Sequence, residues 1–111
     1  AEEIIKKLRS EVKGDKEVVL KSIEANLFLK EGKLEEAEAI SKELIKKNRN
    51  IYNIGLMAKI YVYMYKSSMS NGLQQMAKTY RVQAEFLIDE GLTIDAENAR
   101  LLGTRNQLDE Y

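Results

Sequence analysis

The sequence predicts an all-α domain of about six helices joined by short turns. Apolar residues recur at spacings of three and four along almost the whole chain, which is the period of a helix with one buried face. Single Gly, Asn and Ser residues interrupt this pattern, and the chain contains no Pro. The 111 residues suffice for one domain with a modest core, and 44% apolar with 32% charged residues is typical of a folded chain.

The first half of the chain predicts a leading helix followed by a helical hairpin. The leading helix covers 1–14 and ends at Gly14, and Asp15 is a good N-cap for the next helix. That second helix ends at a turn made by Gly32. The third helix covers 34–47, with acidic residues in its first turn and basic residues in its last turn, which is the order that the helix dipole favours.

The fourth helix is predicted over 51–66, with Asn50 as its N-cap. It is the most apolar segment of the chain and is apolar on more than one face, so we expect it to be buried between neighbours. The short Ile-Tyr-Val-Tyr run at 60–63 lies inside this helical pattern and predicts no strand. The sequence then predicts a break, made by Ser67, Ser68, Ser70, Asn71 and Gly72.

Two further helices are predicted after this interruption. Asn71, with Gln74 three residues later, resembles a capping box at the start of a fifth helix. That helix covers 73–90 and is closed by Gly91. Asp95 is the predicted cap of a sixth helix that completes the chain.

An internal repeat relates the two halves of the chain. Ala25 and Ala58 are 33 residues apart, each is followed three residues later by an aromatic residue, and a turn and a second helix follow in each copy. The first copy carries a motif that resembles the tetratricopeptide repeat (TPR), a helix–turn–helix unit of about 34 residues: Ala25-x-x-Phe28-x-x-x-Gly32-x-x-Glu35-Glu36-Ala37. The resemblance covers 15–50 well and 51–98 loosely.

The resemblance implies antiparallel helical hairpins that stack as a short TPR-like right-handed superhelix within one domain. The chain then divides into a leading helix (1–14), a first hairpin (15–50), a longer and degenerate second hairpin (51–94) and a C-terminal capping helix (95–111). A plain helical bundle is the alternative architecture.

A stack of helical hairpins exposes a concave face, which in the TPR family holds an extended peptide or a helix of a partner. The resemblance therefore implies a non-catalytic protein–protein interaction module or scaffold. The family's clamp for a terminal carboxylate is not expected, because Ser22 and Leu56 stand where that pattern has Lys and Asn. Transferred to this chain, the partner-binding residues of the concave face are Val19, Ser22, Asn26, Leu29, Lys30, Tyr52, Lys59, Val62, Tyr63 and Arg100.

The residue types that are absent exclude several classes of function. The chain has no His and no Cys, so it lacks the ligands of ordinary zinc, haem and iron–sulfur sites and the partners of a Ser-His-Asp or Cys-His nucleophile. Its six glycines are dispersed and form no phosphate-binding loop. We therefore expect no enzymatic activity, no metal and no cofactor, with a paired-carboxylate enzyme as a minor alternative.

Charge and hydropathy narrow the expected partners. Basic and acidic residues number 18 each, which argues against binding to a nucleic-acid backbone. The basic cluster of Lys46, Lys47 and Arg49 falls at a helix end, where cations offset the helix dipole. No apolar run is long enough to cross a membrane, and no signal-peptide pattern opens the chain, so we expect a soluble protein. A chain without Cys suits the cytoplasm and the periplasm equally, so the compartment stays open. Surface binding to a membrane through 51–65 is a minor alternative.

Self-assembly into a homo-oligomer is the main alternative function. The unfinished ends of a helical stack expose apolar faces, and these can pack against further copies of the same chain. Among the aromatic residues, we expect Tyr61 and Tyr80 to pack between hairpins, whereas Tyr63 fits packing and recognition equally. The four methionines are predicted to fill the core rather than to form a binding surface.

Overall fold

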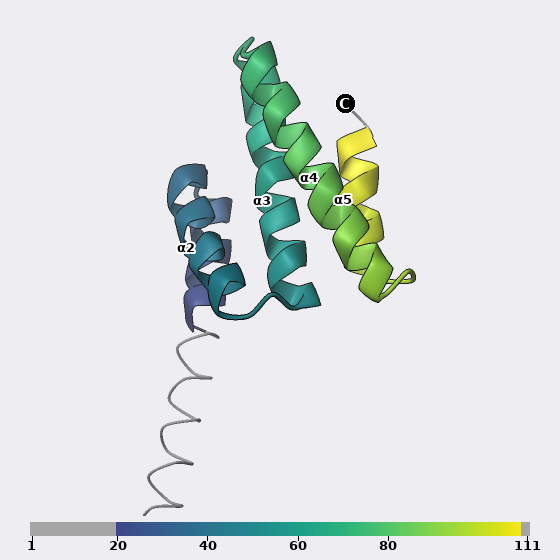
Figure 1. Ribbon diagram of the computed structural model, residues 1–111. Coiled ribbons are helices and arrows are strands. Elements are labelled where there is room, and N and C mark those ends of the chain that lie inside the picture. Colours follow the sequence, from purple (N-terminus) through teal and green to yellow (C-terminus); the bar gives the residue numbers. More distant parts are fainter. Residues whose placement is uncertain (1–19, 110–111) are drawn as a thin grey trace, which may run out of the picture.

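The computed structural model describes residues 20–109, and this part of the chain is all-helical with no strand. It contains five helices (Figure 1): the helix over residues 20–30, α2 (Leu34–Lys47), α3 (Ile51–Ser70), α4 (Gln74–Ile94) and α5 (Ala99–Asp109). The all-α prediction is therefore confirmed. The predicted leading helix over 1–14, with its Gly14 and Asp15 signals, lies outside the described residues.

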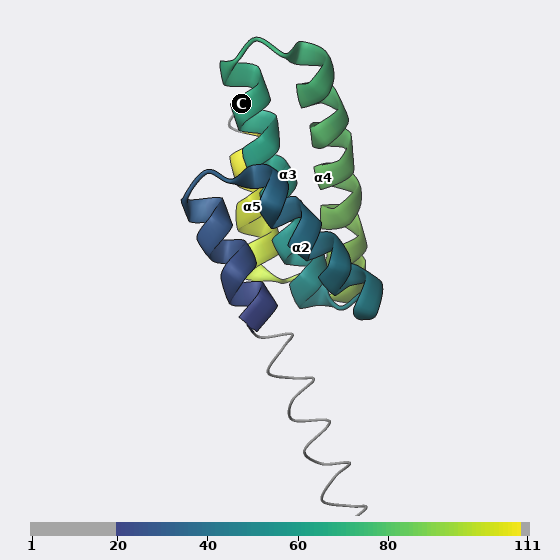
Figure 2. The same ribbon diagram turned by 90° about the vertical axis from the view of Figure 1, so that its left-hand side faces the viewer.

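The helices form two antiparallel hairpins and a last single helix. The helix over 20–30 pairs with α2, and α3 pairs with α4 (Figures 1 and 2). Helix α3 is central, because it packs against α2, α4 and α5, and α5 also packs against α4. The second hairpin extends well beyond the first at its turn end, as both views show.

The two hairpin turns are built in the same way, 40 residues apart. Gly32 and Gly72 both adopt a left-handed conformation, with φ of 78° and 73°, which favours glycine. Each is followed five residues later by a fully buried alanine, Ala37 or Ala77, where the second helix meets the first. The backbone hydrogen bonds also correspond, from Gly32 to Leu29 and Lys33 to Phe28 in one turn and from Gly72 to Met69 and Leu73 to Ser68 in the other.

The turns repeat after 40 residues, whereas the buried pair Ala25 and Ala58 in the first helices repeats after 33. The second hairpin is therefore seven residues longer in its first helix. Its second helix is longer by the same amount, because α4 has 21 residues and α2 has 14. Seven residues are close to two turns of α-helix, so the extension keeps the same faces turned toward the core.

Two predicted N-caps near the second hairpin are wrong. The capping box of Asn71 and Gln74 does not form, because Leu73 occupies the N-cap position of α4 without a side-chain cap and the Gly72 turn bonds to the end of α3 instead. Asp95 does not cap the last helix either. Its carboxylate accepts from the Glu97 N–H at 3.2 Å in a local turn.

Several boundaries also differ from the prediction. Helix α3 continues through the three serines at 67–70, and α4 passes through Gly91 to end at Ile94. Helix α5 begins at Ala99, and the Asn98 Oδ1 accepts a hydrogen bond from the Leu101 N–H at 3.1 Å. In contrast, the predicted cap at Asn50 is confirmed, because its side chain accepts from the Asn53 N–H at 2.9 Å.

The core follows α3, which is buried on more than one face as its composition predicted. Ile54, Ala58, Ile60 and Val62 are all fully buried, and their spacing places them on more than one face of the helix. Tyr61 and Tyr80, which were predicted to pack between hairpins, stack on each other within the second hairpin, with ring centroids 6.0 Å apart. Among the described helices, none is both long and apolar enough to pass through a lipid bilayer.

The methionines divide between the core and the surface. Met57 and Met64 are buried in α3, as predicted for core-filling residues. Met69 and Met76 are exposed on either side of the Gly72 turn. This turn lies in the part of the second hairpin that extends beyond the first hairpin. The prediction is therefore right for two of the four.

The two hairpins are joined by a hydrogen-bonded connection between α2 and α3. The buried Asn53 side chain donates from Nδ2 to the Asn48 carbonyl at 2.7 Å and to the Leu44 carbonyl at 3.3 Å, so it satisfies backbone groups at the end of α2. In the same connection, Arg49 binds both oxygens of Glu90 on α4, at 2.7 and 2.6 Å. This pairing also lowers the pKa of the Glu90 carboxyl.

Helix α5 is held against the second hairpin by a close approach and by an arginine. Gly91 of α4 faces Leu101 of α5, and a Cβ atom at Gly91 would overlap the Leu101 Cδ1 atom. Near the other end of α5, Arg81 donates from Nη1 to the Tyr65 hydroxyl at 3.2 Å and to the Leu108 carbonyl at 3.3 Å. The three helices α3, α4 and α5 are thereby fixed relative to one another.

Candidate functional site

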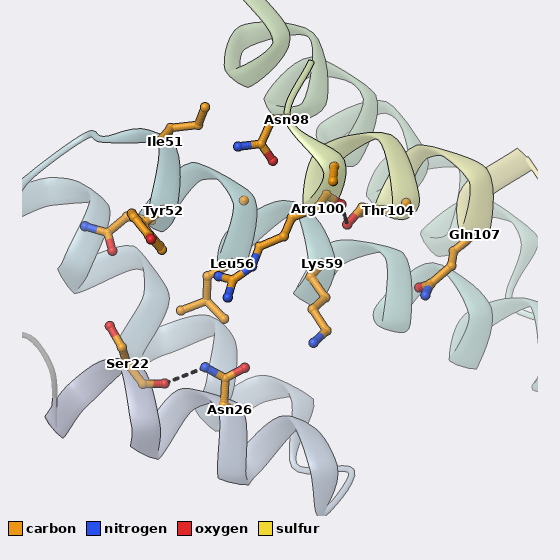
Figure 3. A pocket seen from close by; sticks show the side chains of 14 residues that line it. Ser22, Asn26, Ile51, Tyr52, Leu56, Lys59, Asn98, Arg100, Thr104 and Gln107 are labelled. Atoms are coloured by element: carbon orange, nitrogen blue, oxygen red, sulfur yellow. Dashed lines mark hydrogen bonds between the residues drawn. The ribbon is translucent and has the colours of Figure 1, made fainter. Parts of the chain in front are cut away.

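A groove of about 660 Å³ opens between the helix over 20–30, α3 and α5. These are the first helix of each hairpin and the last single helix, so the groove lies on the face that the second helices α2 and α4 leave uncovered (Figure 3). Its lining residues are Ser22, Asn26, Ile51, Tyr52, Asn53, Gly55, Leu56, Lys59, Asn98, Ala99, Arg100, Gly103, Thr104 and Gln107.

The wall from the helix over 20–30 is polar. Ser22 and Asn26 are one turn apart and half-buried, and the Asn26 Nδ2 donates to the Ser22 carbonyl at 2.9 Å. Figure 3 shows both side chains directed toward α3, with Leu56 facing them from the opposite wall. This wall therefore offers hydrogen-bonding groups beside an apolar side chain.

The wall from α5 presents one face of the helix. Arg100, Thr104 and Gln107 recur at spacings of four and three, so they lie on the same side of α5. The Thr104 hydroxyl is buried and donates to the Arg100 carbonyl at 2.8 Å. Toward the groove it can therefore act only as a hydrogen-bond acceptor. Gly103 adds no side chain, and nothing in the structure lies within 4 Å of the position a Cβ atom would take there.

Tyr52 and Arg100 connect two walls across the mouth of the groove. The Arg100 guanidinium lies over the Tyr52 ring, 5.5 Å from its centroid, in a cation–π contact between α5 and α3. Tyr52 is nevertheless 71% exposed. An exposed aromatic ring that is already held in position is a common anchor at protein interfaces, because little conformational entropy is lost when a partner covers it.

Lys59 lies further along α3 and is half-buried. Its side chain extends into the space between α3, α5 and the helix over 20–30, with Asn26 and Gln107 on either side (Figure 3). Its ammonium group and the guanidinium of Arg100 are the cationic groups of the groove.

Five of the ten predicted partner-binding residues meet in this groove: Ser22, Asn26, Tyr52, Lys59 and Arg100. They come from three helices that are far apart in the sequence: the helix over 20–30, α3 and α5. These five predicted residues therefore lie on the side of their helices that faces the groove.

The other predicted residues lie elsewhere. Leu29 and Val62 belong to the core, with 7% and 0% exposure, because each is turned toward a packed neighbour rather than toward the groove. Lys30 and Tyr63 are exposed but do not line the groove, and Tyr63 is 38% exposed on α3, one helical turn beyond Lys59. Val19 lies outside the described residues.

Sequence reasoning missed much of the contribution from α5. Asn98, Ala99 and Gln107 line the groove but were not among the predicted residues. The sequence did contain part of this information, because the spacing of Arg100, Thr104 and Gln107 places them on one face of a helix. It was obscured by the predicted start of the last helix at Asp95, which hid the role of Asn98 at its true beginning.

The chemistry of the groove is that of a binding surface with hydrogen-bonding groups, an exposed ring and two cations. Its amide and hydroxyl groups can pair with the backbone of a bound chain, and Tyr52 with Leu56 can bury apolar atoms. Within residues 20–109, no cluster of three or more acidic side chains is placed to hold a metal ion.

Comparisons with known proteins were made for the whole chain. No family model matches it, and neither a search of curated proteins nor a search of solved structures returns a match.

Proposed function

We propose that this protein is a non-catalytic interaction module that binds a peptide or a helix of a partner protein in the groove. The observation that carries this proposal is the convergence of Ser22, Asn26, Tyr52, Lys59 and Arg100 from three helices on one open groove of about 660 Å³. The exposed Tyr52 ring and the row of hydrogen-bonding side chains are the features that such a partner segment needs.

The proposed arrangement of the hairpins is a short TPR-like right-handed superhelix. Its support is the repeated turn at Gly32 and Gly72, the buried alanines at Ala37 and Ala77, and the placement of the groove on the first helices. In a stack of this kind the first helices line the inner face and the second helices form the outer face.

Selection of a displayed random 12-residue peptide library on the intact chain tests the proposed function. Peptides that bind in the groove lose about tenfold in affinity when Tyr52→Ala removes the exposed ring. The matched control is Phe86→Ala, which removes an exposed aromatic ring from α4, outside the groove, and leaves affinity unchanged. Selection that yields no binding peptide, or binding that depends on Phe86 and not on Tyr52, contradicts the proposal.

Self-assembly is a second candidate, and a specific observation favours it. Leu20, Ile23 and Leu27 form a stripe on the helix over 20–30, at spacings of three and four, and each is more than half exposed. Light scattering over a wide concentration range tests this candidate. Self-assembly gives a mass that rises with concentration and returns to the monomer value in Ile23→Glu, whereas a constant monomer mass removes it.

A further inference from the structure

The charges of the groove differ from those of the whole chain. The chain carries 18 basic and 18 acidic residues, so its formal net charge is zero. Of the fourteen residues that line the groove, the charged ones are Lys59 and Arg100, and no Asp or Glu is among them. The carboxylates are thus excluded from this surface, and the groove has a local charge of two positive units.

Neither cation is neutralised by a carboxylate in the described part of the chain. The ion pairs there involve other basic residues, namely Lys21, Lys33, Lys42, Arg49 and Arg81. Arg100 instead lies over the Tyr52 ring, 5.5 Å from its centroid, and this cation–π contact leaves guanidinium N–H groups for a bound anion. Lys59 is half-buried among neutral polar groups.

The neutral groups around the two cations add hydrogen-bond donors. Asn98 accepts the Leu101 N–H through Oδ1, so its amide N–H groups are the part that remains for a ligand. Asn26 and Gln107 lie on either side of the Lys59 side chain (Figure 3). Cations from two different helices, with amides beside them, form a cradle that suits two carboxylates better than one.

We propose that the occupant of the groove is an acidic peptide segment whose Asp or Glu side chains pair with Lys59 and Arg100. This inference rests on the proposed function and names the chemistry of the partner. Tyr52 and Leu56 add apolar contacts beside the cations, so the favoured segment alternates acidic and apolar residues. A protein partner is favoured over a nucleic acid, because a phosphate backbone is bound through many cations and this groove has two.

The test repeats the peptide selection on three proteins: the intact wild-type chain, the double variant Lys59→Gln/Arg100→Gln and the control double variant Lys46→Gln/Lys78→Gln. The control removes the same charge from exposed positions on α2 and α4 that do not line the groove. Each displayed peptide is joined to the coat protein through its C-terminus, so it offers no terminal carboxylate and only its side chains can supply the anions.

The wild type and the control are expected to enrich peptides in which Asp and Glu outnumber Lys and Arg by at least about threefold, and the groove double variant loses this excess. A synthetic peptide from the enriched pool binds the groove double variant about fivefold more weakly, which is the effect of two partly exposed ion pairs. Its affinity for the wild type falls as salt is raised.

Three other outcomes would contradict the acidic-peptide inference, the proposed function or both. Peptides that depend on Tyr52 but carry no acidic excess overturn the acidic-partner inference and leave the proposed function intact. Failure to enrich any groove-binding peptide overturns both. A twelve-nucleotide oligothymidylate is the competitor. If it displaces the enriched peptides and binds more tightly than they do, the occupant of the groove is a nucleic acid and not a peptide.

Discussion

Asn53 is a buried amide whose side chain bonds to the last carbonyls of α2, so one residue links the two hairpins. Asn53→Asp replaces the donating N–H group by a second oxygen that faces two carbonyl oxygens. We expect the free energy of unfolding, measured with urea, to fall by about 2 kcal/mol or more. The loss should shrink at pH values low enough to protonate the new carboxyl, which then becomes a donor.

The matched control for this substitution is Asn106→Asp, an identical exchange at an exposed position of α5. We expect it to change stability by less than about 0.5 kcal/mol. If both variants lose the same stability, the hydrogen bonds from Asn53 to α2 contribute nothing specific.

The buried hydroxyl of Tyr61 should make the folded protein less stable at alkaline pH. Burial and then the Glu38 carboxylate, which also accepts its hydrogen bond, raise the pKa of the Tyr61 hydroxyl above its ordinary value of 10.0. A tyrosine in the unfolded chain ionises near pH 10, whereas Tyr61 in the folded chain stays neutral, so its contribution to stability is complete below that pH and is lost as the pH rises above it. We expect the urea midpoint to begin to decline near pH 10 and to fall further as the pH rises.

Tyr61→Phe separates this effect from other alkaline effects. The variant keeps the ring that stacks on Tyr80, loses the hydroxyl, and should show a flatter decline of the urea midpoint above pH 10 than the wild type. Tyr52→Phe is the control, because Tyr52 is mostly exposed and its substitution should leave the profile unchanged. Identical profiles for wild type and Tyr61→Phe would assign the decline to other groups.

At the scale of helices, the contact between α4 and α5 depends on the absence of a side chain at Gly91. Gly91→Ala places a methyl group against the buried Leu101, and the cost of overpacking should exceed the gain in helix propensity, with a net loss of about 1–2 kcal/mol. Gly103→Ala in α5 meets nothing within 4 Å and should stabilise the protein by about 0.5–1 kcal/mol. Thermal and urea unfolding of both variants measure the two signs, and equal signs would contradict the argument.

The existence of the helices was predictable from the sequence, and their ends were less so. The spacing of apolar residues and the charge order of α2 identified that helix with its boundaries. The serines after Lys66 predicted the end of the helix, but α3 continues to Ser70. The turn at Gly72 lies beyond these residues, and packing against α4 outweighs their weak helix propensity. Gly91 read as a helix end, whereas it serves a tertiary contact that the local sequence does not reveal.

The same division applies to the candidate site. The 33-residue spacing of Ala25 and Ala58 placed Asn26 and Lys59 on the groove side, because each follows a buried alanine in the same helical phase. Val62 was misplaced since α3 is surrounded by three helices, and a face that is open in a simple repeat is covered here. The lining from α5 required the true start of that helix, which a side-chain cap at Asn98 determines.

At the scale of the whole molecule, the groove depends on the position of α5, which forms one of its walls. Arg81 of α4 holds α5 there through hydrogen bonds to Leu108 of α5 and Tyr65 of α3. Arg81→Leu keeps part of the apolar stem and removes the bonds to Tyr65 and Leu108. We expect amide hydrogen exchange in the second half of α5 to become about tenfold faster, while exchange in α2 stays unchanged. Arg105→Leu, at an exposed site on α5, is the control. Equal protection of α5 in Arg81→Leu and the wild type would show that apolar packing alone holds this wall.

The matched extension of both helices in the second hairpin bears on how such a chain changes length. Helices α2 and α4 differ by seven residues, and the turns at Gly32 and Gly72 show the same difference in the first helices. Seven residues lengthen a helix by about 10.5 Å and rotate its end by only about 20° from its former direction. We therefore expect a change of seven residues to keep the packed faces in contact when it is made in both arms, whereas a change in one arm alone leaves about two turns of that helix without a partner helix.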